Sequence, residues 1–185
     1  MKTELKAKFL QHILSKKKED QGFTLIELLV VIIIIGILSA IALPSFLNQA
    51  NKAKQSEAKT YIGSMNRAQQ AFYLENNTFA AQADFSKLGL GIATQTTNYV
   101  YAINGGGANT TAATNQAQLV LPKGPLKAYI GGVMVGTTAT SEATTLAVLC
   151  EAASAGVNGG DAGSASAAFG TAPTCPTATY VSAAK

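Results

Sequence analysis

The sequence has few of the residues on which enzymes and metal proteins depend. Among its 185 residues there are one histidine, His12, and two cysteines, Cys150 and Cys175. Two cysteines are too few for a four-cysteine zinc site, and one early histidine leaves the rest of the chain without a catalytic dyad or a histidine–metal site. No P-loop or dinucleotide-binding fingerprint occurs either. We therefore expect a protein that is not an enzyme, with no catalytic residues, no cofactor and no metal.

Charged side chains are also scarce, and they are unevenly distributed. They make up 13% of the chain, whereas ordinary soluble domains carry about 25%. Residues 1–22 hold six lysines against three acidic residues, and the remainder holds eight basic against seven acidic residues. Most of the net charge of +4 therefore lies in a short basic leader. The low charge of the remainder indicates that part of this protein avoids water, and its length suits one domain with an appendage.

An apolar segment over residues 23–47 accounts for the scarcity of charge. It reads FTLIELLVVIIIIGILSAIALPSFL and contains a single charged residue, Glu27. About 20 apolar residues in a helix cross the hydrocarbon core of a bilayer, so this segment is long enough to span a membrane. Three lysines precede it, and the positive-inside rule then keeps the N-terminus in the cytoplasm and directs the C-terminal part outward. These lysines are Lys16, Lys17 and Lys18.

Beyond Pro44 the apolar residues recur at spacings of three and four, which predicts an amphipathic helix over residues 48–76. Joined to the apolar segment, it forms one helix of about 50 residues. Pro44 should kink this helix, because it removes a backbone hydrogen bond and its ring crowds the preceding turn. The polar face is compatible with a nucleic-acid stripe, although we expect a solvated helix face. Its basic residues and the nearby tyrosines are Lys52, Lys54, Lys59, Arg67, Tyr61 and Tyr73.

Residues 77–185 lose the helical periodicity and become rich in threonine, alanine, glycine and asparagine. Short runs of β-branched and aromatic residues predict strands of an antiparallel sheet. Glycine and proline clusters predict the turns between these strands, at residues 105–107 and 122–125. The expected strands cover residues 99–103, 118–121, 129–135 and 146–150.

The two cysteines bracket the last part of this region. An even pair of cysteines in an exported domain indicates one disulfide, Cys150–Cys175, and two reduced thiols are the alternative. Residues 152–175 are rich in glycine and alanine, and we expect them to have little to fold around. A disulfide would hold this loop in place.

The junction between the leader and the apolar segment carries a specific motif, Gly-Phe-Thr-Leu-Ile-Glu-Leu, which begins at Gly22. With the lysine-rich leader, the apolar run and Pro44, it closely resembles the type IV pilin family over residues 16 to about 50. The resemblance implies an inner-membrane prepilin peptidase that cuts after Gly22 and N-methylates Phe23. An ordinary secretory signal, cut after residues 40–42, is the alternative.

The resemblance also implies a role for Glu27. An ionised carboxylate within the hydrocarbon region costs roughly 2.5 to 3.5 kcal/mol, so the side chain needs a cationic partner. Cleavage creates one, the new amine of Phe23, which is mostly protonated at neutral pH. In the family this glutamate meets the N-terminal amine of a neighbouring subunit and sets the stagger between subunits. The alternative is that Glu27 simply lies at the membrane interface.

For the whole chain the resemblance implies an α+β fold. A long N-terminal helix, membrane-spanning in its first half and amphipathic in its second, packs on a small antiparallel sheet. The implied function is that of a major pilin, most similar to those of cyanobacteria. Identical subunits would assemble into a retractile surface filament for motility, adhesion and DNA uptake. Before assembly the chain would be a single-pass inner-membrane protein, in contact with lipid and the pilus assembly machinery. It would then join an extracellular pilus.

Three other functions share these features. A pseudopilin of a type II secretion system has the same leader, glutamate and long helix, but typically has a calcium site and no C-terminal disulfide. The two late cysteines and the few acidic residues favour a pilin. A minor pilin fits the same motif, because abundance is not written in the sequence. A secreted or anchored binding protein, which would use the apolar segment as a plain anchor, is the remaining alternative.

Overall fold

The structure is a computed structural model that describes residues 8, 11–12, 22–137 and 143–183. Most of the leader, including its three consecutive lysines, lies outside the described residues. The contacts divide the chain into two compact units, Met1–Leu47 and Asn48–Lys185, and each is described by itself. One helix, α2 (Leu25–Asn76), contributes residues to both units.

In the unit Met1–Leu47, the described residues from Gly22 onward are all exposed. Within the described residues, one helix is long and apolar enough to cross a membrane, and it is α2. Length and composition alone identify this helix, and a signal sequence has the same two properties. Pro44 lies inside α2 and cannot donate the bond to the carbonyl of Ala40 that a helix would normally have. The kink stays a prediction.

The unit Asn48–Lys185 is built on an antiparallel sheet with the strand order β1-β2-β3-β4-β7. Its strands are β1 (Tyr99–Gly105), β2 (Ala112–Leu119), β3 (Tyr129–Thr137), β4 (Ala143–Ala152) and β7 (Tyr180–Ser182). A second, two-stranded sheet pairs β5 (Ala168–Phe169) with β6 (Pro173–Thr174). Two short 3-10 helices complete the unit, η1 (Gln82–Leu88) and η2 (Gly156–Asn158). The predicted α+β fold is confirmed.

Three of the four expected strands fall within β1, β3 and β4, but the strand expected at residues 118–121 overlaps only the last two residues of β2 and extends into the turn that follows. The chain turns there, with the Gly124 N–H donating to the carbonyl of Leu121 (2.9 Å). β2 lies earlier, at residues whose side chains are largely polar, and three of them are nevertheless buried: Thr114, Asn115 and Gln116. A search for apolar runs misses most of this strand because three consecutive buried positions, residues 114–116, are polar.

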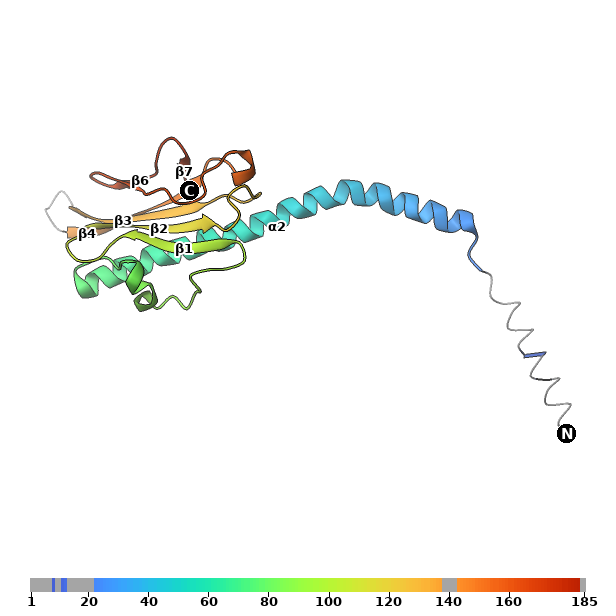
Figure 1. The fold of residues 1–185 in the computed structure, drawn as a ribbon, viewed down its shortest axis with the longest axis horizontal. Helices are drawn as coiled ribbons and strands as arrows, with labels where there is room; N and C mark the ends of the chain where they lie inside the picture. The colour runs from blue at the N-terminus through green and yellow to red at the C-terminus, as the bar shows by residue number, and fades with distance from the viewer. Residues whose placement is uncertain (1–7, 9–10, 13–21, 138–142, 184–185) are drawn as a thin grey trace. The chain divides into compact units, whose positions relative to one another are not determined.

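The second half of α2 packs along one face of the five-stranded sheet (Figure 1). Residues at spacings of three and four lie on one side of a helix. The buried residues of α2 follow this spacing and include two amides: Ala58, Ile62, Met65, Asn66 and Gln69. The predicted amphipathic helix is therefore confirmed, and it ends at Asn76 as the sequence indicates.

The two buried amides of α2 are satisfied by residues distant in sequence. Asn66 Nδ2 donates to the carbonyl of Val148 (2.9 Å), and Asn115 Nδ2 donates to Asn66 Oδ1 (2.8 Å). Gln69 Nε2 donates to the carbonyl of Ala80 (3.0 Å), whose N–H donates back to Gln69 Oε1 (2.8 Å). Leaving a buried amide without a partner costs about 1–3 kcal/mol. These bonds therefore favour one rotation and one register of α2 on the sheet.

Two adjacent glycines of β3 reveal what covers each face of the sheet. A Cβ built on Gly131 would lie 2.8 Å from Cγ of Asn66, whereas one on Gly132 would lie 2.6 Å from Cβ of Ala167. Successive residues of a strand point to opposite faces. The C-terminal segment therefore covers the face opposite α2. The expectation that residues 152–175 have little to fold around is wrong, because small side chains let this segment pack closely on the sheet.

We expect Gly131→Ala to destabilise the unit Asn48–Lys185 by about 1–3 kcal/mol, the usual cost of overpacking a core. The added methyl would displace the Asn66 side chain, which cannot move without losing its bonds to Val148 and Asn115. Urea unfolding of the full-length chain in detergent, followed by circular dichroism, measures this loss.

Gly63→Ala is the matched control for this prediction. A Cβ on Gly63, within α2, has nothing within 4 Å. Alanine is favoured over glycine inside a helix by about 0.5–1 kcal/mol, so this variant should be slightly more stable than the original chain. An unfolding midpoint for Gly131→Ala equal to that of Gly63→Ala would contradict the close packing described here.

Candidate processing and assembly site

The predicted cleavage point lies in a short exposed stretch before α2. Residues 22–24 have no helical structure, and α2 begins at Leu25. Phe23 is 80% exposed, and a Cβ on Gly22 would meet nothing within 4 Å. The bond between Gly22 and Phe23 is therefore accessible to an enzyme, and no described part of the chain requires glycine at this position.

Glu27 and Thr24 form a capping box at the start of α2. The backbone N–H and the hydroxyl of Thr24 both donate to Glu27 Oε2 (2.8 Å each), and the Glu27 N–H donates to Thr24 Oγ1 (3.3 Å). This arrangement satisfies backbone donors that the first turn of a helix leaves free. No described residue donates to Glu27 Oε1, so one carboxylate oxygen is left for a cation.

The capping role of Glu27 was missed by the sequence interpretation, although the sequence contains its signal. A threonine followed three residues later by a glutamate, just before an apolar run, is the usual capping-box pattern. The same glutamate therefore has a role within its own chain as well as the predicted role between chains. The pairing of Glu27 with the Phe23 amine of a neighbour stays a prediction.

A disulfide joins Cys150 and Cys175, as the sequence predicted. Cys150 is buried in β4, and Cys175 follows β6 directly. The bond closes the segment that covers the second face of the sheet. A further link within this segment is Asp161, which accepts hydrogen bonds from the Gly163 N–H and the Tyr180 hydroxyl (2.7 Å each).

Replacing both cysteines by serine should lower the free energy of unfolding by about 3 kcal/mol, the chain-entropy value for a loop of this size. The expected readout is a lower urea midpoint for the full-length chain in detergent. A reducing agent should bring the original chain to the midpoint of the variant and leave the variant unchanged. Equal midpoints for the oxidised original chain and the variant would refute a stabilising disulfide.

The residues that are compatible with a nucleic-acid stripe mostly have partners inside the unit. The ring of Tyr61 contacts Tyr101 with centroids 5.4 Å apart, and the ring of Tyr73 contacts Phe79 at 4.8 Å. Lys59 Nζ donates to the carbonyl of Ala183 (2.8 Å). The two tyrosines are therefore engaged in contacts with the sheet and the loop after α2, and base stacking on them would compete with these contacts.

Comparison with known proteins identifies the group to which this chain is related. Residues 55–176, more than half of the chain, match the protein family described as type IV pilin-like G and H. The chain belongs to this pilin-like family. An N-terminal segment of this pilin, residues 17–43, also matches the prokaryotic N-terminal methylation motif. The two matches cover the leader junction, the apolar segment and most of the unit with the sheet.

Several relatives are similar to parts of this pilin. The type IV major pilin protein PilA of Myxococcus xanthus is 39% identical over 104 residues, 56% of this chain and 45% of that protein. The type IV wide pilus major component PilA4 of Thermus thermophilus is 31% identical over 93 residues, 50% of this chain and 70% of that protein. The type II secretion system core protein G of Aeromonas hydrophila is 36% identical over 64 residues, 35% of this chain and 45% of that protein.

The pilin thus spans less than half the length of two of these three relatives. No solved structure matches it. The sequence around the leader junction predicted a type IV pilin, and the family match, the motif match and the fold confirm this prediction.

Proposed function

We propose that this pilin is a major structural subunit of a type IV pilus. The observation that carries the proposal is the presence of two matches in one chain. A methylation motif spans the exposed Gly22–Phe23 bond, and a pilin-family match covers the unit that α2 and the sheet form. Relatives of the same family are named as major components of pili, which supports a major rather than a minor role.

In the proposed processing and assembly of the subunit, each of its four segments has a separate role. A peptidase removes the leader, residues 1–22, and methylates the new amine of Phe23. Residues 23–47 hold the subunit in the membrane and then pack against identical subunits in a helical filament. Residues 48–76 carry the amphipathic helix, and residues 77–185 carry the sheet and the disulfide, which form the outer part of the fibre. The protein has a structural role and is not an enzyme.

The proposed localisation changes during assembly. The subunit is first a single-pass inner-membrane protein surrounded by lipid, with its leader in the cytoplasm. The inner-membrane assembly machinery then moves it into an extracellular pilus. A retractile fibre of this kind serves motility and adhesion, and DNA uptake is a further role for it, although the tyrosine contacts described above give nucleic-acid binding little support.

Electron microscopy of sheared surface fibres, combined with mass spectrometry of their subunit, tests the proposal. We expect fibres whose main protein begins at Phe23 and carries one additional methyl group on its amine. A fibre with this chain as a trace component would indicate a minor pilin. A mature chain that begins at Leu43 would refute a pilin altogether, because an ordinary signal peptidase would then have removed the apolar segment.

A pseudopilin of a type II secretion system is the second candidate, and the match to a core protein G favours it as an alternative. The two functions predict different phenotypes when the gene is deleted. Loss of the gene for a pilus subunit removes surface fibres and leaves the export of secreted enzymes intact. Loss of a pseudopilin gene has the opposite effect.

A further inference from the structure

A group of basic and apolar side chains surrounds the first turns of α2 in the unit Asn48–Lys185. Two grooves bring the residues together. One is lined by Lys54, Leu121 and Pro125 among others, and the second by Lys52, Lys127, Val157 and their neighbours. We call this group the basic rim. It consists of the groove residues Lys52, Lys54, Leu121, Lys127 and Val157, together with the exposed Lys123, which lies in the same loop as Leu121.

The two loops of the basic rim are bonded to each other. The Val157 N–H donates to the carbonyl of Gly124 (2.8 Å), and the Gly156 N–H donates to the carbonyl of Leu126 (3.0 Å). The loops approach so closely that a Cβ on Gly156 would lie 2.9 Å from the carbonyl carbon of Pro122. This connected backbone presents two large apolar side chains to solvent, Leu121 with 72% and Val157 with 62% of their surface exposed.

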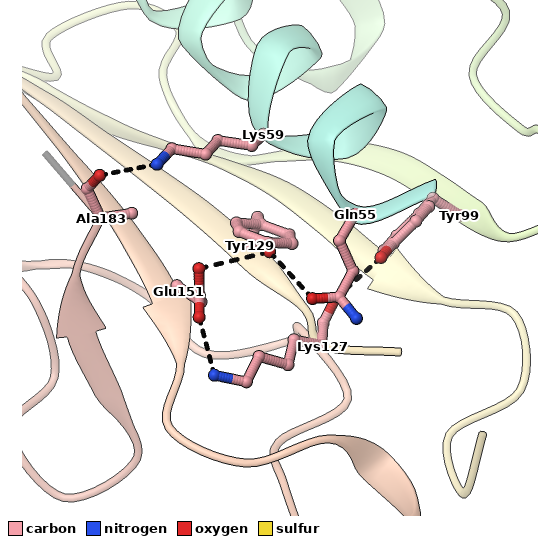
Figure 2. A network of polar contacts seen from close by, with 7 residues as sticks. All are labelled: Gln55, Lys59, Tyr99, Lys127, Tyr129, Glu151 and Ala183. Carbon is pink, nitrogen blue, oxygen red and sulfur yellow. Dashed lines mark hydrogen bonds and ion pairs between the residues drawn. The ribbon is translucent and has the colours of Figure 1, made fainter. Parts of the chain in front are cut away.

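The charge of the basic rim is positive. Its acidic neighbour Glu151 is paired with Lys127 (2.7 Å) and lies 3.3 Å from the Tyr129 hydroxyl, as Figure 2 shows. Burial, and then the adjacent Glu151 carboxylate, raises the pKa of Tyr129, so its hydroxyl stays protonated and donates. The other three lysines are exposed, and the next acidic residue of α2, Glu57, lies one turn beyond Lys54.

The position of the basic rim along the chain points to its partner. Its lysines on α2 follow the apolar segment 23–47 without a break in the helix. Lys54 comes only seven residues after Leu47, so the chain itself keeps this lysine near the end of the apolar segment. The headgroup region on each side of a bilayer extends several Å beyond a hydrocarbon core of about 30 Å. Lysines at this distance, next to exposed apolar side chains, are the combination that binds membrane interfaces.

We propose that the basic rim docks on the lipid headgroups of the membrane that anchors the subunit. The exposed lysines contact headgroup phosphates, while Leu121 and Val157 enter the boundary between headgroups and acyl chains. This inference rests on the proposed membrane anchoring and adds a second point of contact with the bilayer. Docking orients the unit Asn48–Lys185 on the membrane before assembly. Extraction of the subunit into a fibre then has to break these contacts.

The test uses the full-length chain in vesicles that contain lipid with a spin-labelled headgroup. A fluorophore is attached through a new cysteine, because both natural cysteines form the disulfide. Pro125→Cys and Asn158→Cys, at exposed residues that line the grooves, report on the basic rim and leave Leu121 and Val157 in place. Leu74→Cys, at a side chain that is 78% exposed near the end of α2, is the control in the same unit. Ile34→Cys, in the apolar segment, reports whether the anchor has inserted.

We expect the spin label to quench both rim fluorophores and to leave the Leu74→Cys fluorophore unaffected. Rim quenching should be stronger in mixed phosphatidylcholine and phosphatidylglycerol vesicles than in phosphatidylcholine alone. Lys52→Gln/Lys54→Gln should lower the equilibrium constant for docking roughly 30-fold, which corresponds to about 1 kcal/mol for each lysine near an anionic surface. Arg67→Gln/Lys87→Gln, which removes two exposed charges elsewhere in the unit, should leave it unchanged.

Three outcomes would overturn the proposal. Rim fluorophores that stay bright while the Ile34→Cys fluorophore reports insertion would show an anchored chain whose rim does not touch lipid. Quenching that is equal in both lipids and insensitive to the lysines would exclude recognition of phosphates. Rim fluorescence that is not quenched by the spin label and changes only at a high ratio of protein to lipid would assign the surface to a second copy of the chain. Failure of the Ile34→Cys fluorophore to insert would instead refute the membrane anchoring in the proposed function, and the docking with it.

Discussion

Surface fibres are expected to disappear when Glu27 is replaced by glutamine, while removal of the leader continues. Glutamine keeps the shape of the side chain and can still occupy the N3 position of a capping box. It removes only the negative charge, which we propose to pair with the Phe23 amine of a neighbouring subunit. Unpaired charge within the hydrocarbon region costs roughly 2.5 to 3.5 kcal/mol, so the pair strongly favours the correct stagger between subunits.

Thr24→Ala is the matched control for this prediction. It removes the hydroxyl that contacts Glu27 Oε2 and keeps the carboxylate. Losing an N-cap residue costs about 1 kcal/mol of helix stability, an effect confined to the first turn of a long helix. Fibres should therefore persist in Thr24→Ala. Normal fibres in Glu27→Gln, together with their loss in Thr24→Ala, would show that Glu27 acts through the capping box and not through a charge between subunits.

Replacing Gly22 by leucine should leave the full-length precursor in the membrane and prevent fibre formation. The described part of the chain provides no reason for this effect, because the site is exposed and a Cβ added to Gly22 meets nothing within 4 Å. We propose that the loss arises in the peptidase, whose active site would accept glycine and reject a bulky residue at this position. The uncut chain keeps a leader with six lysines against three acidic residues, and it lacks the amine that Glu27 requires.

Immunoblots of membranes and of sheared fibres test this prediction. They separate the uncut precursor from the mature chain, because the precursor keeps residues 1–22 and is longer. Gly22→Ala serves as a graded control and should allow partial cleavage, because its side chain is the smallest that can be added. Unfolding of the unit Asn48–Lys185 should be the same in both variants. Fibres assembled from uncut Gly22→Leu precursor would overturn the account of cleavage as the step that creates the charge.

Much of the fold could be predicted from local patterns. The continuous apolar run and the later spacing of three and four residues predicted the two halves of α2, because helix formation depends on nearby residues. Strands rich in aromatic and β-branched residues, such as β1 and β3, were found for the same reason. The capping box was present in the sequence as Thr24 and Glu27 and was overlooked, because the glutamate was interpreted only through its contact with a neighbour.

The remaining features depend on contacts between distant residues. Most of β2 escaped prediction because three of its consecutive buried positions are polar, and Thr114, Asn115 and Gln116 become acceptable in a core only when partners are present. For Gln116 those partners are the carbonyls of Ser164 and Ala165, nearly fifty residues away. The same segment was expected to have little to fold around, and its close packing on Gly132 appears only once the sheet has formed.

The sequence alone determined the membrane-length apolar helix, the leader junction at Gly22 and Phe23, and the single charge at Glu27. Each of these depends on composition or on neighbours in the chain, which the sequence contains in full. Tertiary structure decided where the amides of α2 bind, what covers each face of the sheet, and that two loops form a basic rim beside Lys52 and Lys54. A polar or small side chain is compatible with many environments, and only folding selects the partners that satisfy it.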